Sequence, residues 1–205
     1  MRLLIVFWGI FMRITMSFIL FLLLTVLIAC GGEESSEVPF TQINQSEKIY
    51  TLEDVKSLGF KKGKTYKVKD LKDAESAYFG FYKKPGSKDA IDYELRFYPD
   101  HDIAISSGLE IAKERVGPYA KLKKDEASWT EGLKDARVCG GNGGGVNTGG
   151  VGAAGDHGAG SCSSPKYNEF FVIGNMIALC QGDDEAESRI HCVNLLSLIQ
   201  GTQVE

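Results

Sequence analysis

Five cysteines and three histidines are the side chains of this 205-residue chain best suited to nucleophilic, redox or metal chemistry. Four of the cysteines, Cys139, Cys162, Cys180 and Cys192, lie in its last third. In an exported protein, an even number of cysteines is typical of disulfide bonds. Four cysteines permit three pairings. We predict Cys139–Cys162, which would close the segment between them, and Cys180–Cys192, which would tie a strand to the helix that follows it.

Thiol or metal chemistry is the alternative use of these side chains. Asp156, His157 and Cys162 could form the centre of a thiol- or metal-dependent enzyme of the cell envelope. However, the sequence has no C-x-x-C motif, and no two Cys or His residues stand two to four positions apart. A zinc site would have to draw on scattered residues: Cys139, His157, Cys162, His191 and Cys192. We therefore predict no metal and no cofactor, and keep the enzyme as the alternative hypothesis.

Two further motifs favour structural interpretations. Residues 150–155 match G-x-G-x-x-G, but a dinucleotide site needs a strand before this motif and a helix after it. Eleven of the residues from 140 to 160 are glycine, so the match arises by chance in a glycine-rich loop. Asp100-His101-Asp102 is interpreted as the start of a helix.

The first thirty residues form a separate zone of the sequence. Arg2 and Arg13 are its only charged residues, a mainly apolar run covers residues 14–28, and Ala29 precedes Cys30. A basic start, a short apolar core and a small residue before the cleavage site are typical of a secretory signal peptide. An uncleaved membrane helix that ends in a chance cysteine is the alternative interpretation.

The last four residues of this zone, Leu27-Ile28-Ala29-Cys30, resemble the lipobox of bacterial lipoproteins. In that family a diacylglyceryl group is attached to the cysteine thiol, and a dedicated signal peptidase cuts just before it. The resemblance implies lipidation of Cys30 and a lipid-anchored protein on the extracytoplasmic side of the cell membrane or the outer membrane. Two acyl chains suffice for a stable anchor, because each buried CH₂ contributes about 0.8 kcal/mol. The stretch 93–117 is also similar to stretches of uncharacterised bacterial lipoproteins.

Composition limits the range of functions. The chain carries 23 Lys plus Arg and 27 Asp plus Glu, a net charge of −4, which excludes a generally basic nucleic-acid binder. Its length allows one ordinary domain. The main basic cluster contains six lysines between residues 61 and 72. A solvated face is the favoured interpretation of this cluster, and contact with anionic headgroups or an acidic partner is the alternative.

Hydrophobic spacing predicts the secondary structure of the remaining chain. Alternating apolar residues around turn-forming residues predict two antiparallel strand pairs: 76–84 with 91–98, and 167–173 with 176–181. Apolar residues at helical spacing predict four helices: 52–58 capped by Thr51, 100–116, 122–137, and a last helix capped by Asp183 and ended by Gly201.

These elements predict an α+β fold, a two-layer domain in which an antiparallel sheet of about four or more strands carries helices on one face. We expect a signal peptide over 1–29, a lipidated cysteine and flexible tether over 30–48, and a single domain over 49–205 with a Gly-rich loop at 139–165. Because no catalytic motif is present, the favoured function is a membrane-tethered, non-catalytic binding or scaffold domain. Its expected partner is the membrane, through the lipid anchor, together with an unidentified envelope component and no nucleic acid.

Overall fold

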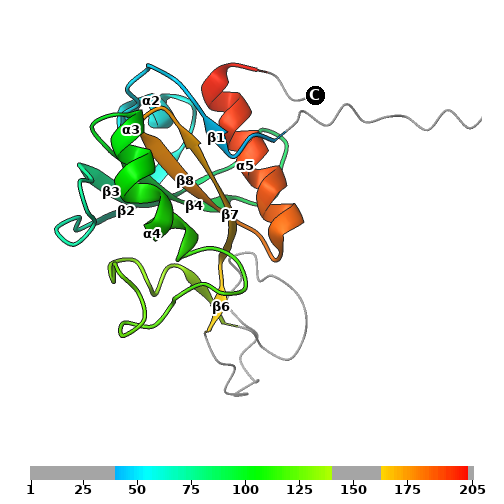
Figure 1. Cartoon of the computed structure of the whole chain (residues 1–205). Coiled ribbons are helices and arrows are strands. Elements are labelled where there is room, and N and C mark those ends of the chain that lie inside the picture. Colours follow the sequence, from blue (N-terminus) through cyan, green and yellow to red (C-terminus); the bar gives the residue numbers. More distant parts are fainter. Residues whose placement is uncertain (1–39, 140–162, 203–205) are drawn as a thin grey trace, which may run out of the picture. The chain divides into compact units, whose positions relative to one another are not determined.

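The computed structural model describes residues 40–139 and 163–202. Residues 38–205 form one compact unit, separate from residues 1–37, and every described element belongs to it. The expected signal peptide, Cys30 and most of the Gly-rich loop lie outside the described residues. The unit consists of a six-stranded sheet and several helices, which confirms the predicted α+β class (Figure 1).

The main sheet has the strand order β1-β7-β8-β4-β3-β2. The strands are β1 (Ile43–Asn44), β2 (Lys61–Tyr66), β3 (Ser76–Tyr82), β4 (Ile91–Phe97), β7 (Tyr167–Ile173) and β8 (Met176–Gln181). Both predicted pairs, β3 with β4 and β7 with β8, are present and antiparallel. The two hairpins join where β4 pairs with β8, also antiparallel. Because β1 runs parallel to β7, the sheet as a whole is mixed.

Neither edge strand follows from the hydrophobic pattern. β1 pairs with β7, and Phe40 packs against the core, so the domain begins within the segment 30–48 that was expected to be a tether. At the other edge, β2 occupies the lysine-rich stretch, and only its last residue, Tyr66, is buried. Lysines at such a place are typical of edge strands, where they discourage pairing with other chains.

Helices cover both faces of the sheet, which corrects the prediction of a two-layer domain with helices on one face. The helical segments are α2 (Leu52–Ser57), α3 (His101–Ile103), the π-helical turn η1 (Ala104–Gly108), α4 (Leu109–Lys113) and α5 (Glu185–Gln200). Ile173 and Ala178 lie in a core with α2 and α5, whereas Val172 and Ile177 lie in a second core with α3 and η1 (Figure 1). Successive strand residues point to opposite faces, so these are the two sides of one sheet. The nearly continuous apolar run of β7 and β8 is typical of strands buried on both faces.

The helix ends follow the predicted capping chemistry, with one shift. Thr51 begins α2, because its hydroxyl accepts the Asp54 N–H while the Asp54 carboxylate accepts the Thr51 N–H. The last helix begins one residue later than predicted, since Asp184 rather than Asp183 accepts the N–H three residues on. Gly201 ends α5 in the left-handed conformation, with φ of 72°.

The helix predicted over 122–137 does not form. Leu122, Trp129 and Leu133 are buried, as their spacing indicated, but the chain between them is a series of turns. Gly132 has a φ of 72°, which interrupts any right-handed helix at that point. The apolar spacing therefore located buried residues correctly and the element type wrongly.

The helix predicted over 100–116 forms as α3, η1 and α4 in succession and ends at Lys113. After the irregular segment that follows, β5 (Arg137–Val138) pairs antiparallel with β6 (Ser164–Pro165) in a separate two-stranded sheet. β5 and β6 lie close to the two ends of the predicted Gly-rich loop, residues 139 and 165, so their pairing brings these ends together.

Candidate functional site

The sequence-predicted chemical residues fall into two groups. Cys30, Asp156, His157 and Cys162 lie outside the described residues, so the lipidation site and the alternative enzyme site stay predictions. Cys139 is disulfide-bonded. Because its predicted partner Cys162 is not among the described residues, that pairing also stays a prediction.

The predicted disulfide between Cys180 and Cys192 is present. Its S–S distance is 2.05 Å, and it links β8 to α5 across a sequence separation of 12. Both residues are completely buried in the core beneath α5. The bond therefore fixes α5, the longest of the described helices, to the sheet and leaves neither sulfur as a free thiol.

The described histidines and the Asp-His-Asp cluster serve local structure. Asp100 begins α3 by accepting a backbone N–H at 2.8 Å, as predicted. His101 Nδ1 lies 2.9 Å from the carbonyl oxygen of Gly174, and His191 Nδ1 lies 2.6 Å from that of Gln181. A carbonyl only accepts, so Nδ1 carries the proton in both rings. Within residues 40–139 and 163–202, no group of three His, Cys, Asp or Glu residues could hold a metal ion.

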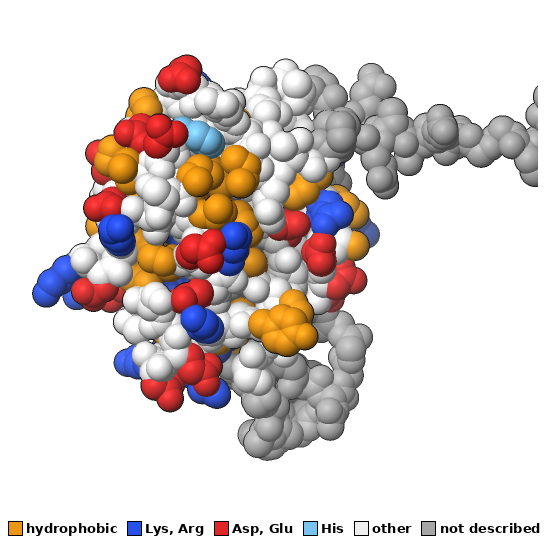
Figure 2. Space-filling model, viewed as in Figure 1, with side chains coloured by type: hydrophobic (Ala, Val, Ile, Leu, Met, Phe, Trp, Pro, Cys, Tyr) orange, Lys and Arg blue, Asp and Glu red, His pale blue; other side chains and the backbone are white. Residues whose placement is uncertain are grey.

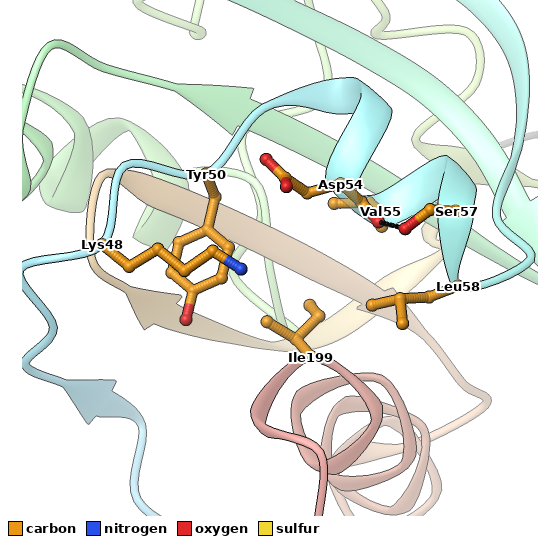
Figure 3. Close-up of a pocket in the computed structure, with 7 residues that line it drawn as sticks. All are labelled: Lys48, Tyr50, Asp54, Val55, Ser57, Leu58 and Ile199. Carbon is orange, nitrogen blue, oxygen red and sulfur yellow. Dashed lines mark hydrogen bonds between the residues drawn. The ribbon is translucent and has the colours of Figure 1, made fainter.

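A pocket of about 100 Å³ lies between α2 and the C-terminal turn of α5 (Figure 3). Val55, Leu58 and Ile199 supply its apolar side chains, and Tyr50 adds an aromatic ring. The Lys48 side chain lies along that ring, with its Nζ 4.7 Å from the ring centroid (Figure 3). The pocket thus combines an apolar floor with one cation.

The β7–β8 turn holds the Tyr50 side of this pocket in place. Asn175 Oδ1 accepts the Tyr50 N–H at 2.6 Å, while Nδ2 donates to the carbonyls of Tyr50 and Tyr98. A Cβ on Gly174 would lie 2.5 Å from the Lys48 carbonyl oxygen, so the close packing requires glycine there. Sequence reasoning identified Gly174-Asn175 as a turn but missed these side-chain bonds, because their partners are more than 70 residues away.

The other polar groups of the pocket, Asp54 and Ser57, already have hydrogen-bond partners within α2 and its cap. Hydrogen bonds from Thr51 lower the pKa of Asp54, and the Lys48 charge acts in the same direction. Ser57 Oγ donates to the Asp54 carbonyl at 2.6 Å. The pocket is also well below the roughly 300–1,000 Å³ of typical ligand sites. Its small size, and a lining that already contains both Lys48 and Asp54, therefore do not suit enclosure of a substrate.

A buried ion cluster on the opposite face of the sheet was not predicted. Glu94 accepts hydrogen bonds from Arg96 Nε at 2.8 Å and from Arg115 Nη1 at 2.9 Å. The three side chains are at most 3% exposed. Arg115 also donates to the carbonyls of Trp129 and Glu131. The alternation of Glu94 and Arg96 with aromatic residues placed them on one strand face, but it did not reveal that this face is buried.

Trp129 completes the cluster from the segment predicted to be helical. The guanidinium carbons of Arg115 and Arg96 lie 4.5 and 5.0 Å from its ring centroid, within cation–π range. Its indole N–H donates to the Lys67 carbonyl at 3.2 Å. Arg96 Nη1 has no hydrogen-bond partner among the described residues. In this cluster the Glu94 carboxylate is shared by the guanidinium groups of Arg96 and Arg115. Each charge offsets part of the desolvation cost of the other two. This arrangement indicates a structural role for the cluster.

Buried tyrosines form part of all three hydrophobic clusters: Tyr93 in the first, Tyr167 in the second and Tyr66 in the third. Burial raises the pKa of Tyr66 and Tyr167, and the nearby Glu94 charge raises both further. Burial also raises the pKa of Tyr93. These phenols stay protonated at neutral pH. Tyr66 donates to the Asp135 carboxylate at 2.9 Å, so its hydroxyl serves the packing of the domain.

These features define a disulfide-bonded α+β domain with an ion cluster in its interior and one small pocket between α2 and α5. None of the described helices is long and apolar enough to cross a membrane. Residues 51–201 match the model of a family of unknown function, DUF6810, and the chain belongs to this family. The match includes α2, α5 and every strand of the main sheet except β1. No curated protein and no solved structure matches the chain.

Proposed function

We propose that the protein is a lipid-anchored lipoprotein whose α+β domain binds a partner on the extracytoplasmic side of a membrane. The observation that carries the proposal is Leu27-Ile28-Ala29-Cys30 at the end of an apolar run. The disulfide between Cys180 and Cys192 supports export independently, because disulfides persist mainly in oxidising compartments. The favoured role is binding or scaffolding, without catalysis.

The placement of charged groups supports binding over catalysis. Glu94, Arg96 and Arg115 bind one another in the interior, and Asp54 is committed to the N-terminus of α2. On β2 and around it, the exposed charged groups are mainly lysines. Exposed ammonium groups recognise anionic partners well and offer no nucleophile–base pair.

The lipid anchor can be tested by mass spectrometry of the membrane form. Cys30 should be its N-terminal residue and should carry acyl chains. Cys30→Ser should release the protein from the membrane or stall its processing, whereas Ser35→Ala, five residues downstream, should do neither. If the Cys30→Ser protein is processed and retained as the unsubstituted protein is, the lipoprotein proposal fails.

A thiol count distinguishes binding from the enzyme alternative built on Asp156, His157 and Cys162. A Cys139–Cys162 disulfide would occupy the proposed nucleophile. The folded, exported protein should therefore show no free thiol, because Cys30 would be thioether-linked. A reactive thiol that maps to Cys162 would favour the enzyme.

A further inference from the structure

One segment of the domain carries a charge opposite to that of the whole chain. Residues 61–88 contain nine lysines and three acidic residues, a net charge of +6, whereas the whole chain has a net charge of −4. The rest of the molecule is therefore strongly acidic by comparison. Charge separation of this size creates a directional field, which favours one orientation toward an anionic partner.

The fold spreads these lysines along one outer edge of the sheet, which we call the β2 edge (residues 61–72 and 83–88). β2 is the last strand in the sheet order, and its Lys61 lies opposite Phe81 near the hairpin 83–88. At the other end of the strand, Tyr66 pairs with Ala77, beside the loop that carries Lys67, Lys69 and Lys72. Basic side chains project at the left margin of Figure 2, on the side where Figure 1 labels β2 and β3.

Most of these ammonium groups are available to an external partner. Among the described residues, only Lys64 of the nine lysines has a carboxylate partner, Asp135. Lys62 donates to the hydroxyl of Thr65, and Lys83 donates to a backbone carbonyl. Eight lysines thus carry charges that no described carboxylate balances.

Protection of an edge strand explains only part of this pattern. Lysines within β2 discourage pairing with other chains, but those in the flanking loop and hairpin lie outside the strand. Phe81, an aromatic side chain that is 37% exposed, lies opposite Lys61 in the same edge region. Cations around an exposed aromatic ring match the interface of a bilayer that contains anionic lipids.

We propose that the β2 edge docks on the anionic headgroups of the same membrane that holds the anchor; the shared membrane rests on the proposed lipidation of Cys30. The described chain enters at β1, at the opposite edge of the sheet. Six strands about 4.8 Å apart span about 24 Å, and the nine residues 31–39 can extend to about 30 Å. The chain is therefore long enough for the β2 edge to reach that surface.

Vesicle co-sedimentation of residues 38–205, the compact unit that lacks Cys30, tests the docking directly. Partitioning onto vesicles of phosphatidylglycerol and phosphatidylcholine at low salt should exceed that onto pure phosphatidylcholine at least tenfold. Partitioning onto the anionic vesicles should fall as added salt shortens the Debye length. Lys67→Glu with Lys69→Glu should reduce it at least fivefold. The matched pair Lys56→Glu with Lys124→Glu changes the net charge equally at exposed sites outside the segment and should have a much smaller effect.

Three results would overturn the proposal. Equal partitioning onto both vesicle types would show no headgroup recognition. An equal loss in both variant pairs would show dependence on net charge alone. Binding to soluble polyglutamate without binding to vesicles would assign the β2 edge to an acidic protein partner. Residues 38–205 lack Cys30, so the vesicle result does not depend on whether Cys30 is lipidated. Failure of the docking proposal can therefore be distinguished from failure of the lipoprotein proposal.

Discussion

Among the described residues, Glu94 is the one carboxylate that contacts both buried guanidinium groups of the ion cluster. Glu94→Gln keeps the shape of the side chain but leaves Arg96 and Arg115 without a countercharge. Removing one partner from a buried ion pair costs about 3–5 kcal/mol. We therefore expect the free energy of unfolding, measured by urea denaturation, to fall by that amount.

Glu53 provides the matched control for this substitution. Its side chain is 76% exposed on α2 and, within the part of the chain that the structure describes, pairs only with Lys56. Exposed pairs of this kind contribute about 0–1 kcal/mol, so Glu53→Gln should have little effect. Similar losses for the two variants would contradict a structural role for the buried cluster.

Glu114 gives a prediction about pH. Burial raises the pKa of its carboxyl, but hydrogen bonds from Lys121 and Ser128 outweigh this effect and leave the pKa lowered. A group whose pKa is lower in the folded state contributes stability above its unfolded pKa and loses it as pH falls through the folded pKa. The unsubstituted protein should therefore lose more stability than Glu114→Gln does as pH falls below about 4.3, the unfolded value for glutamate.

Thermal unfolding from pH 7 to pH 3 measures this difference. Glu110→Gln is the control, because the exposed carboxylate of Glu110 pairs with Lys113 on the same helix and with no other cation of residues 40–139 and 163–202. Parallel stability curves for Glu114→Gln and the unsubstituted protein would mean that the contacts of Glu114 do not favour its charged form.

At the scale of elements, α5 is joined to the sheet by packing and by the Cys180–Cys192 bond. In the chain-entropy model, a crosslink over about 12 residues contributes roughly 3 kcal/mol, mainly by restricting the unfolded chain. The double variant Cys180→Ala with Cys192→Ala should therefore unfold at lower denaturant concentration while retaining its native helix content by circular dichroism.

A reductant provides the control for that double variant, because Cys139 is disulfide-bonded as well. Reduction should destabilise the unsubstituted protein by more than it destabilises the double variant, which has already lost one bond. If reduction destabilises both proteins equally, the bond between β8 and α5 contributes nothing measurable.

The elements that the sequence predicted correctly are those with strong local signals. β7 and β8 form a long apolar run around Gly174-Asn175, and α2 begins with a capping box, so neighbouring residues suffice to define them. β2 was missed because five exposed positions leave it no hydrophobic pattern. The predicted helix at 122–137 failed because tertiary contacts of Trp129 and the positive φ of Gly132, rather than local preference, determine that segment.

The same distinction applies to the candidate site. The Cys180–Cys192 bond was predictable, because a strand followed by a helix brings nearby cysteines together. The bonds from Asn175 to Tyr50 and Tyr98 join residues separated by 125 and 77 positions. No local pattern specifies such contacts. The burial of Glu94 likewise depends on α4 and the following turns covering a second face.

At the scale of the whole molecule, the sheet is a central layer between two apolar cores. One core contains the disulfide and α5, and the other lies beneath α3 and η1, with Trp129 in a third cluster on that side. Ten of the twenty residues 141–160 are glycine, so this segment offers little apolar side-chain area to any core.

The base of that segment has its own backbone bonds. β5 pairs with β6 through Arg137 opposite Pro165 and Val138 opposite Ser164. The Lys166 N–H donates to the Ala136 carbonyl at 2.9 Å and extends the ladder toward the domain. A shorter connection can therefore join the same two ends without moving β7.

Replacing residues 141–160 with a short Gly/Ser linker should leave the domain folded. Loop-closure entropy changes by only about 0.6 kcal/mol for each doubling of length, which corresponds to a shift in Tm of roughly 1–3 °C for a domain of this size. Calorimetry measures that shift. The control variant places the same linker at 137–166, which also removes β5, β6 and the disulfide-bonded Cys139, and it should lose considerably more stability. A loss on replacing 141–160 as large as that of the control would mean that residues 141–160 themselves stabilise the fold. Intact stability with loss of partner binding would instead assign them a role in recognition.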